Sequence, residues 1–283
     1  FHRAIAQSGY ATWALPRSRN APTPAPLAMD GESAPTAEAI ADRIVSAIST
    51  GVQSAAALRA LDGQALVESL TGFLLPIVDG TSLPEEPGVI FRRSAQRPVP
   101  YMSGGNSFDG SVIRASAITH ADLRRILGES LPTFRALYAA DDDSLWLTRL
   151  FGDYRYVLSA RVLGESMARV DRSAWLYYVD FLPAGQEDKP GTPHGMDAAY
   201  LLRGGMSDDA EVRALAEMMR AYWVNFARQG DPNGEGLPAW PAFSASAGRW
   251  MVFDGADSAA RERVIGRQLD ALERLYRARV DGD

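Results

Sequence analysis

Two short segments of the sequence carry the residue types that acid–base chemistry needs. Residues 104–110 read Gly-Gly-Asn-Ser-Phe-Asp-Gly and contain Asp109, and residues 192–197 read Thr-Pro-His-Gly-Met-Asp and contain His194. A carboxylate that accepts one imidazole N–H fixes the tautomer of the ring, and the other ring nitrogen can then take a proton from a nucleophile. The two segments together therefore indicate the acid–base half of a hydrolytic triad.

Each of these two residues also has a simpler interpretation. An Asp after Gly-Gly-Asn is more often a turn former or a helix cap, and a single His in a loop of Pro and Gly is more often a surface residue. The other two histidines are weaker candidates, because His2 lies beside the first residue and His120 lies at an expected helix start. With three His and no Cys in the chain, we expect no metal site.

A nucleophile is harder to find in this sequence. The elbow pattern Gly-x-Ser-x-Gly needs small residues around a serine on a sharp turn between a strand and a helix. Three Gly-Glu-Ser triplets occur, with their serines at Ser33, Ser130 and Ser166. Ser33 and Ser130 are followed two residues later by Pro, and Ser166 falls within a helical pattern. We therefore expect none of the three to be the nucleophile.

The expected elements place both segments at the ends of strands. Apolar residues 96–103 suggest a buried strand that ends in the Gly-Gly-Asn loop, and the bulky run 174–181 suggests a strand covered on both faces. Residues 119–170 are rich in helical patterns, with Thr119 among the expected helix caps. A long helix capped by Ser207 follows, and the tail after Ala256 is expected to be a charged amphipathic helix. Strands that alternate with helices predict an α/β fold with a mainly parallel sheet, in which ligands bind beyond the carboxyl ends of the strands.

Composition excludes several classes of protein. The net charge is −6 and no basic block occurs, so we do not expect nucleic acid as a partner. No run of about 18 apolar residues predicts a membrane span, and no secretory signal is present. The chain opens at Phe1 without a Met or a start signal, which suggests a truncated reading frame or a processed segment. Its cellular location and oligomeric state stay open.

Several phrases of the sequence resemble, in the same order, those of the type-B carboxylesterases, the family of cholinesterases and bacterial para-nitrobenzyl esterases. The phrases are Phe1-His2-Arg3-Ala4-Ile5-Ala6-Gln7-Ser8-Gly9, Pro76-Ile77-Val78-Asp79-Gly80, Gly105-Asn106-Ser107-Phe108-Asp109-Gly110, Pro193-His194-Gly195, Trp223-Val224-Asn225-Phe226-Ala227-Arg228-Gln229-Gly230-Asp231-Pro232-Asn233 and Trp240-Pro241-Ala242-Phe243. The resemblance spans nearly the whole chain. It implies an α/β-hydrolase fold, of which residues 1–283 are the C-terminal portion of one domain, with a helix-rich insertion at about 119–170.

The resemblance also implies roles for individual residues. Asp109 would be the triad acid, His194 the triad base, and Ser8 a hydroxyl that supports the carboxylate. The nucleophile elbow and the oxyanion loop of the family would lie before residue 1. The expected partners are therefore a small-molecule ester and the missing N-terminal part of the domain. No cofactor is expected, and this chain alone is expected to be inactive.

Two positions depart from the family pattern. The family acid is usually Glu, whereas here it is Asp109, which is one methylene shorter, so His194 or the backbone must shift to meet it. The Glu that follows the family His is Asp197 here, which we interpret as structural. By analogy Trp13 would line an acyl pocket, although packing beneath the Pro-rich loop is the simpler expectation.

Two other interpretations compete with an esterase. The chain could belong to a binding or adhesion protein that keeps the scaffold and has lost the triad. It could also be a truncated product without function, which would be poorly soluble because a sheet edge and part of the core are exposed. The codons before Phe1 discriminate, since Gly-Glu-Ser-Ala-Gly there supports an enzyme and a replaced Ser supports a binding protein.

Overall fold

The computed structural model describes residues 1–21, 36–48, 54–70, 74–116 and 118–281 of the chain. The strands are β1 (Ala4–Gln7), β2 (Tyr101–Asn106), β3 (Ala174–Val179), β4 (Arg249–Phe253) and β5 (Ala259–Glu262). The helices are α1 (Ala37–Ile48), α2 (Ala55–Arg59), α3 (Gly63–Glu68), α4 (Pro87–Arg92), α5 (His120–Leu127), α6 (Leu131–Leu137), α7 (Leu145–Gly152), α8 (Leu158–Arg169), α9 (Met196–Arg203), α10 (Ala210–Gln229) and α11 (Gly266–Asp281).

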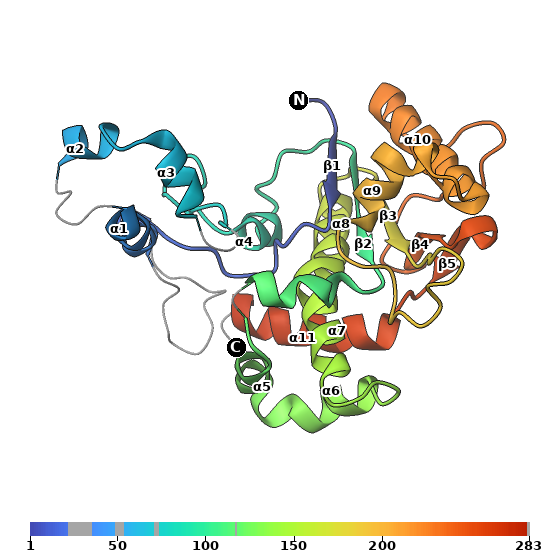
Figure 1. Ribbon diagram of the computed structural model, residues 1–283. Coiled ribbons are helices and arrows are strands. Elements are labelled where there is room, and N and C mark those ends of the chain that lie inside the picture. The colour runs from blue at the N-terminus through green and yellow to red at the C-terminus, as the bar shows by residue number, and fades with distance from the viewer. Residues whose placement is uncertain (22–35, 49–53, 71–73, 117, 282–283) are drawn as a thin grey trace.

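The five strands form one sheet in the order β1-β2-β3-β4-β5 (Figure 1). The first four strands are parallel, with Ala4 opposite Tyr101, and Tyr101 opposite Ala174. The predicted α/β class with a mainly parallel sheet is therefore confirmed. All four parallel strands end at the same edge, which is where the two candidate segments lie.

The fifth strand corrects the expectation for the tail after Ala256. Residues 259–262 pair antiparallel with β4, and helix α11 begins only at Gly266. A 3₁₀ turn at Gly255–Asp257 reverses the chain, and Gly255 has a φ of 57°, which glycine adopts without strain. The short strand has no apolar alternation, so its pairing with β4 is a tertiary effect that sequence periodicity does not reveal.

Helices cover both faces of the sheet, and β3 shows the division most clearly. Leu176 and Tyr178 point into a core shared with α7, α8 and α11, whereas Trp175, Tyr177 and Val179 point into a second core shared with α9 and α10. All six residues of β3 are buried. This confirms the expectation of a strand covered on both faces, and it leaves only the strand ends open to a ligand.

The glycines of the candidate acid segment belong to the strand rather than to a loop. Strand β2 continues through Asn106, whereas the sequence suggested a loop from Gly104 onward. A Cβ at Gly104 would lie 2.2 Å from the backbone oxygen of Tyr177, so β2 and β3 can pair closely only if that side chain is absent.

Two helix starts compare differently with the sequence prediction. The predicted Thr119 cap of α5 is confirmed, since its hydroxyl accepts the N–H of Asp122. Helix α10 is instead capped by Asp209, whose carboxylate accepts the N–H groups of Glu211 and Val212. Ser207 lies two residues before Asp209, so the predicted Ser207 cap is wrong. Consecutive Ser and Asp residues are interchangeable as caps, and a pattern cannot choose between them.

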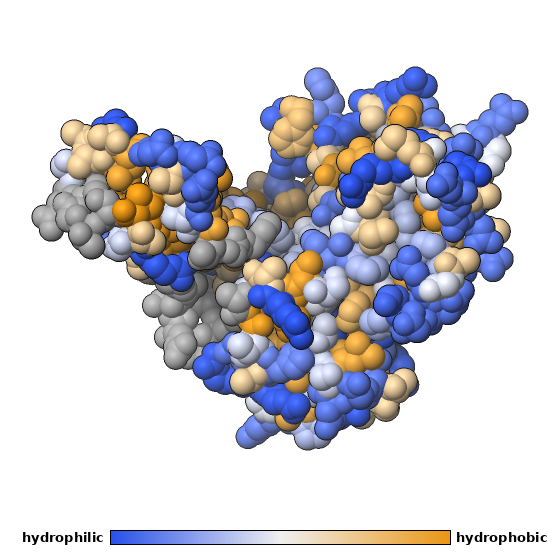
Figure 2. Space-filling model, viewed as in Figure 1, coloured by the Kyte–Doolittle hydropathy of each residue, from blue (hydrophilic) through white to orange (hydrophobic). Residues whose placement is uncertain are grey.

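Helices α1 to α3 form an arm beside the sheet and contribute nothing to its core. None of their residues is buried, and Figure 2 shows apolar side chains gathered on the arm's surface. Leu58 and Val67 are among the exposed large apolar residues. No helix in the described ranges is long and apolar enough to cross a membrane.

Candidate active site

The fold brings Asp109 and His194 into direct contact at the carboxyl edge of the sheet. The chain leaves β2, and the backbone N–H of Phe108 donates to the carbonyl of Thr192 over 2.9 Å, which joins the two segments just before the candidate residues. The imidazole Nδ1 of His194 then lies 2.8 Å from Oδ1 of Asp109. The geometry matches a carboxylate that orients an imidazole.

The carboxylate of Asp109 is buried and held by several donors. Its side chain accepts hydrogen bonds from the Ser8 hydroxyl at 3.0 Å, the Asn106 backbone N–H at 2.8 Å and the Asn106 side-chain amide at 3.2 Å. Burial raises the pKa of Asp109, and the hydrogen bond to His194 opposes that rise. The donors stabilise the charged form and fix the direction of the carboxylate.

Ser8 reaches Asp109 because the chain bends sharply where β1 ends. The backbone N–H of Ser8 donates to the carbonyl of Gly104, which extends the pairing of β1 with β2 by one residue. Ser8 itself has a φ of 48°, an uncommon conformation for a residue with a side chain. The bend aims the Ser8 hydroxyl at the carboxylate, where the sequence hypothesis placed it.

His194 is restrained on three sides and partly open on the fourth. Its backbone N–H donates to the hydroxyl of Ser111 at 2.9 Å, Nδ1 faces Asp109, and its ring packs on that of Tyr156 with centroids 4.6 Å apart. The side chain is 28% exposed. Within the described ranges Nε2 has no hydrogen-bond partner, so this nitrogen is available to a reacting group.

A second buried carboxylate, Asp197, belongs to the same network and has a structural position. It accepts the hydroxyl of Tyr177 at 2.7 Å and the amide of Gln7 at 3.2 Å. Asn106 joins the two acids, since its side-chain amide donates to both Asp109 and Asp197. The Asp197 carboxylate therefore braces Asn106 rather than the imidazole.

Two residues of this site were missed in the sequence. Asn106 stands three residues before Asp109, a spacing at which a turn returns side chains to one another, and this proximity could have flagged it. Tyr156 lies in a helical pattern far from both motifs, and no local signal connects it with His194.

None of the described Gly-Glu-Ser serines lies at a nucleophile elbow. Ser166 is buried within α8, and its hydroxyl donates to the carbonyl of Val162 at 2.8 Å. Ser130 lies at the junction of a 3₁₀ turn and α6. Ser33 lies outside the described residues. His120 does not contact the pair either, since its Nε2 bonds with Thr148, and His2 is exposed at the start of the chain. No cluster of three or more His, Asp or Glu suited to a metal occurs among the residues described.

Comparison with known proteins shows which proteins this chain is similar to. A model of the carboxylesterase family matches residues 139–267. Rabbit (Oryctolagus cuniculus) liver carboxylesterase 1 is 26% identical and bovine (Bos taurus) carboxylesterase 4A is 27% identical. These alignments cover 73% and 86% of this chain and 42% and 51% of the relatives. The chain thus spans about half the length of the curated relatives it matches.

Solved structures show the same fold. The carboxylesterase EST55 of Geobacillus stearothermophilus superposes with a TM-score of 0.70 over 96% of this chain at 21% identity. EstA of Aspergillus niger superposes with a TM-score of 0.73 over 98% of this chain at 19% identity. Each match covers 58% of the solved chain. The family match and the curated relatives therefore support the type-B carboxylesterase family, to whose members this chain is similar, and the solved structures show that it has the α/β-hydrolase fold.

Proposed function

We propose that the chain is the C-terminal portion of a carboxylic-ester hydrolase domain in which His194 is the general base and Asp109 is the acid that orients it. The observation that carries the proposal is the 2.8 Å contact between Nδ1 of His194 and the buried carboxylate of Asp109. In this mechanism Asp109 holds the proton of the imidazole on Nδ1. Nε2 accepts the proton of a serine hydroxyl as that serine attacks the ester carbonyl.

The two residues act again in the later steps. The imidazolium formed by proton transfer is stabilised by Asp109, and it then donates its proton to the leaving alcohol. Water releases the acyl group by the same general-base step. Ser8 and Asn106 keep the carboxylate in place throughout, because both donate to it.

The nucleophile and the oxyanion donors belong, in this proposal, to a part of the domain that precedes residue 1. The chain alone would then bind no tetrahedral intermediate and turn over no ester. The helix-rich residues 119–170 would be an insertion of the same domain, and a small-molecule ester would be the substrate.

An esterase assay tests the proposal. The longer protein, carrying the upstream sequence, should hydrolyse p-nitrophenyl acetate, and His194→Ala should lower kcat by at least about 10³-fold. His120→Ala is the matched control and should leave kcat within about twofold of the unmodified value, since His120 pairs with Thr148 and contacts neither Asp109 nor His194. Turnover by the 283-residue chain alone that Ser166→Ala abolishes would contradict the proposal.

A further inference from the structure

Arg155 is a buried cation without an acidic partner in the described part of the chain. It lies in the single π-helical turn Asp153–Val157 that joins α7 to α8, and it is 2% exposed. Its Nε is fully enclosed and has no hydrogen-bond partner. No carboxylate of the described residues lies within ion-pair distance of it, and burial lowers its pKa. A π-helical turn within an α-helical segment is itself frequent at functional sites.

Four aromatic rings surround the guanidinium and form what we call the aromatic cage. Its carbon Cζ lies 5.2 Å from the ring of Tyr10, 5.3 Å from Trp13, and 5.5 Å from both Phe151 and Tyr156. Ring faces attract a cation electrostatically. They provide no oxygen, however, and a guanidinium has five N–H donors whose best partner is a planar pair of oxygens.

The aromatic cage adjoins the Asp109–His194 pair. Tyr156 is shared, because it contacts both Arg155 and the imidazole of His194. The segment that carries Tyr10 and Trp13 is attached to the π-helical turn by Thr12, whose hydroxyl donates to the carbonyl of Tyr154 at 2.9 Å. This segment follows Ser8, which bonds Asp109. An anion at Arg155 would therefore lie one aromatic ring away from the reacting imidazole.

We propose that Arg155 anchors a carboxylate-binding subsite beside the Asp109–His194 pair, so that the preferred substrates are esters that also carry a free carboxylate. The two carboxylate oxygens would pair with the guanidinium fork, and the aromatic cage would pack on the carbon chain between carboxylate and ester. The substrate role rests on the proposed function, whereas binding of a carboxylate does not. The carboxylate comes either from the substrate or from an acidic side chain elsewhere in a longer protein.

A binding experiment on the 283-residue chain tests the subsite. The probes are monomethyl succinate, which has one carboxylate and one ester, and dimethyl succinate, which has two esters and no charge. Chemical shifts of the His194 ring report binding, and three histidines are few enough to assign by substitution. Monomethyl succinate should shift the His194 signals saturably, with at least tenfold higher affinity than dimethyl succinate. Equal affinity for the two probes would overturn the proposal without any variant.

Variants locate the anion on Arg155. Arg155→Met should abolish the preference for monomethyl succinate, and Arg155→Lys, which keeps the charge but not the fork, should weaken it several-fold. Arg124→Met is the matched control, because Arg124 also lies over an aromatic ring, that of Trp146, outside the site. Folding is checked by circular dichroism. If either folded Arg155 variant retains full preference, the assignment is wrong.

The same titration on the longer protein separates the two sources of the carboxylate. Retained binding of monomethyl succinate identifies the substrate as the source, and loss of binding identifies an acid of the protein itself. If the longer protein hydrolyses neither ester, the proposed function fails while the binding result stands. If it hydrolyses both with equal kcat/KM, the subsite does not select substrates and that part of the inference is overturned.

Discussion

The absence of a side chain at Gly105 makes room for the carboxylate of Asp109. A Cβ at Gly105 would lie 2.4 Å from Oδ2 of Asp109, which is closer than real Cβ contacts. Gly105→Ala should therefore displace the carboxylate from His194 and cost about 1–3 kcal/mol of unfolding free energy. Urea denaturation measures the cost. Gly63→Ala is the control, since a Cβ there meets nothing within 4 Å and should have no destabilising effect.

Asp153 is another buried acid near the pair, and it makes stability depend on pH. Burial raises its pKa to about 7, and its carboxylate accepts the hydroxyl of Tyr138 at 2.7 Å. Between pH 4 and 7 the folded state retains a proton that the unfolded state has lost, so this residue lowers stability as pH rises. Below pH 4 both states are protonated and the effect vanishes.

Asp153→Asn removes this titration and keeps an acceptor for Tyr138. The unfolding free energy of the variant, relative to the unmodified chain, should rise by about 2–4 kcal/mol between pH 4 and pH 7. Urea denaturation at both pH values provides the measurement, with the exposed Asp188→Asn as control. A difference that stays constant with pH would show that Asp153 titrates normally in the folded state.

The site residues that stand in local sequence motifs were predicted, whereas those that only tertiary structure brings to the site were missed. Asp109, His194 and Ser8 stand in phrases that resemble a family pattern, and the structure places the three in contact. Tyr156 and Arg155 come from a π-helical turn. Such a turn shifts the directions of the side chains, and the α-helical periodicity of a sequence does not predict it. Their proximity to His194 exists only in the packed molecule.

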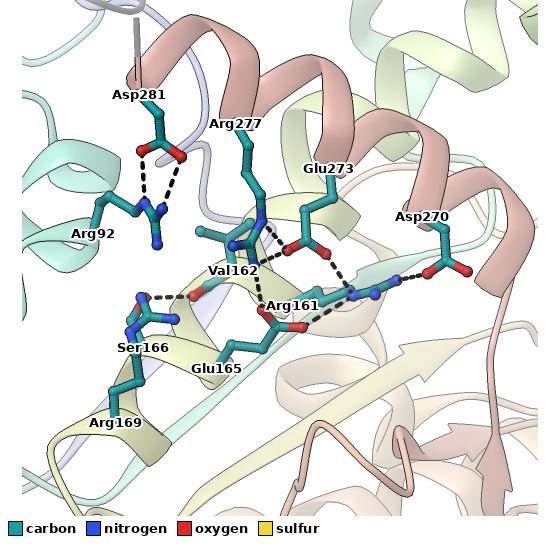
Figure 3. A network of polar contacts seen from close by, with 10 residues as sticks. All are labelled: Arg92, Arg161, Val162, Glu165, Ser166, Arg169, Asp270, Glu273, Arg277 and Asp281. Carbon is teal, nitrogen blue, oxygen red and sulfur yellow. Dashed lines mark hydrogen bonds and ion pairs between the residues drawn. The ribbon is translucent and has the colours of Figure 1, made fainter. Parts of the chain in front are cut away.

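At the scale of elements, a network of charged side chains joins α8 to α11 (Figure 3). Arg161 contacts Asp270 at 2.7 Å, Glu273 at 3.0 Å and Glu165 at 3.3 Å, and Arg277 joins both glutamates. Burial raises the pKa of Glu165, and the neighbouring charge of Glu273 raises it further. Arg161 is therefore the main compensation for a crowded pair of acids, and it holds the C-terminal helix against the helix that follows the site.

Arg161→Met should lower the unfolding free energy by about 2–3 kcal/mol at pH 7, because breaking a buried ion pair leaves uncompensated charges. The loss should shrink as the pH falls, because Glu165, whose pKa is raised by burial, takes up a proton. Arg263→Met is the control. Arg263 also pairs with Asp270, but it is largely exposed and its loss should cost under about 1 kcal/mol. Equal losses for both variants would show that the network adds nothing to α11 docking.

The sequence predicted the elements that have strong internal patterns and not those that depend on neighbours. The bulky run of β3 and the Thr119 cap could be predicted, because burial and capping each favour particular residue types in the local sequence. All four residues of β5 pair with β4, but only Ala259 and Ala260 are apolar, so no local pattern distinguishes this strand from the start of α11. Helix α1 is also amphipathic, yet it lies in the arm beside the sheet and has no buried residue.

At the scale of the whole molecule, the sheet determines the proposed chemistry. Parallel pairing of β1, β2 and β3 aligns their carboxyl ends, so Ser8, Asp109 and the loop that leads to His194 meet at one edge. The buried bonds among Ser8, Asn106 and Asp109 make this arrangement specific. The imidazole tautomer is thus a property of the assembled fold, because His194 in an unfolded chain has no carboxylate beside it.

The tautomer of His194 shows whether Asp109 orients the imidazole. In ¹⁵N NMR spectra of the 283-residue chain at a pH where this imidazole is neutral, we expect a proton on Nδ1 and a free lone pair on Nε2. Asp109→Ala should replace this state by a mixture of tautomers, while Asp188→Ala should not. A neutral His194 that carries its proton on Nε2 in the unmodified chain would contradict the assignment of His194 as the general base.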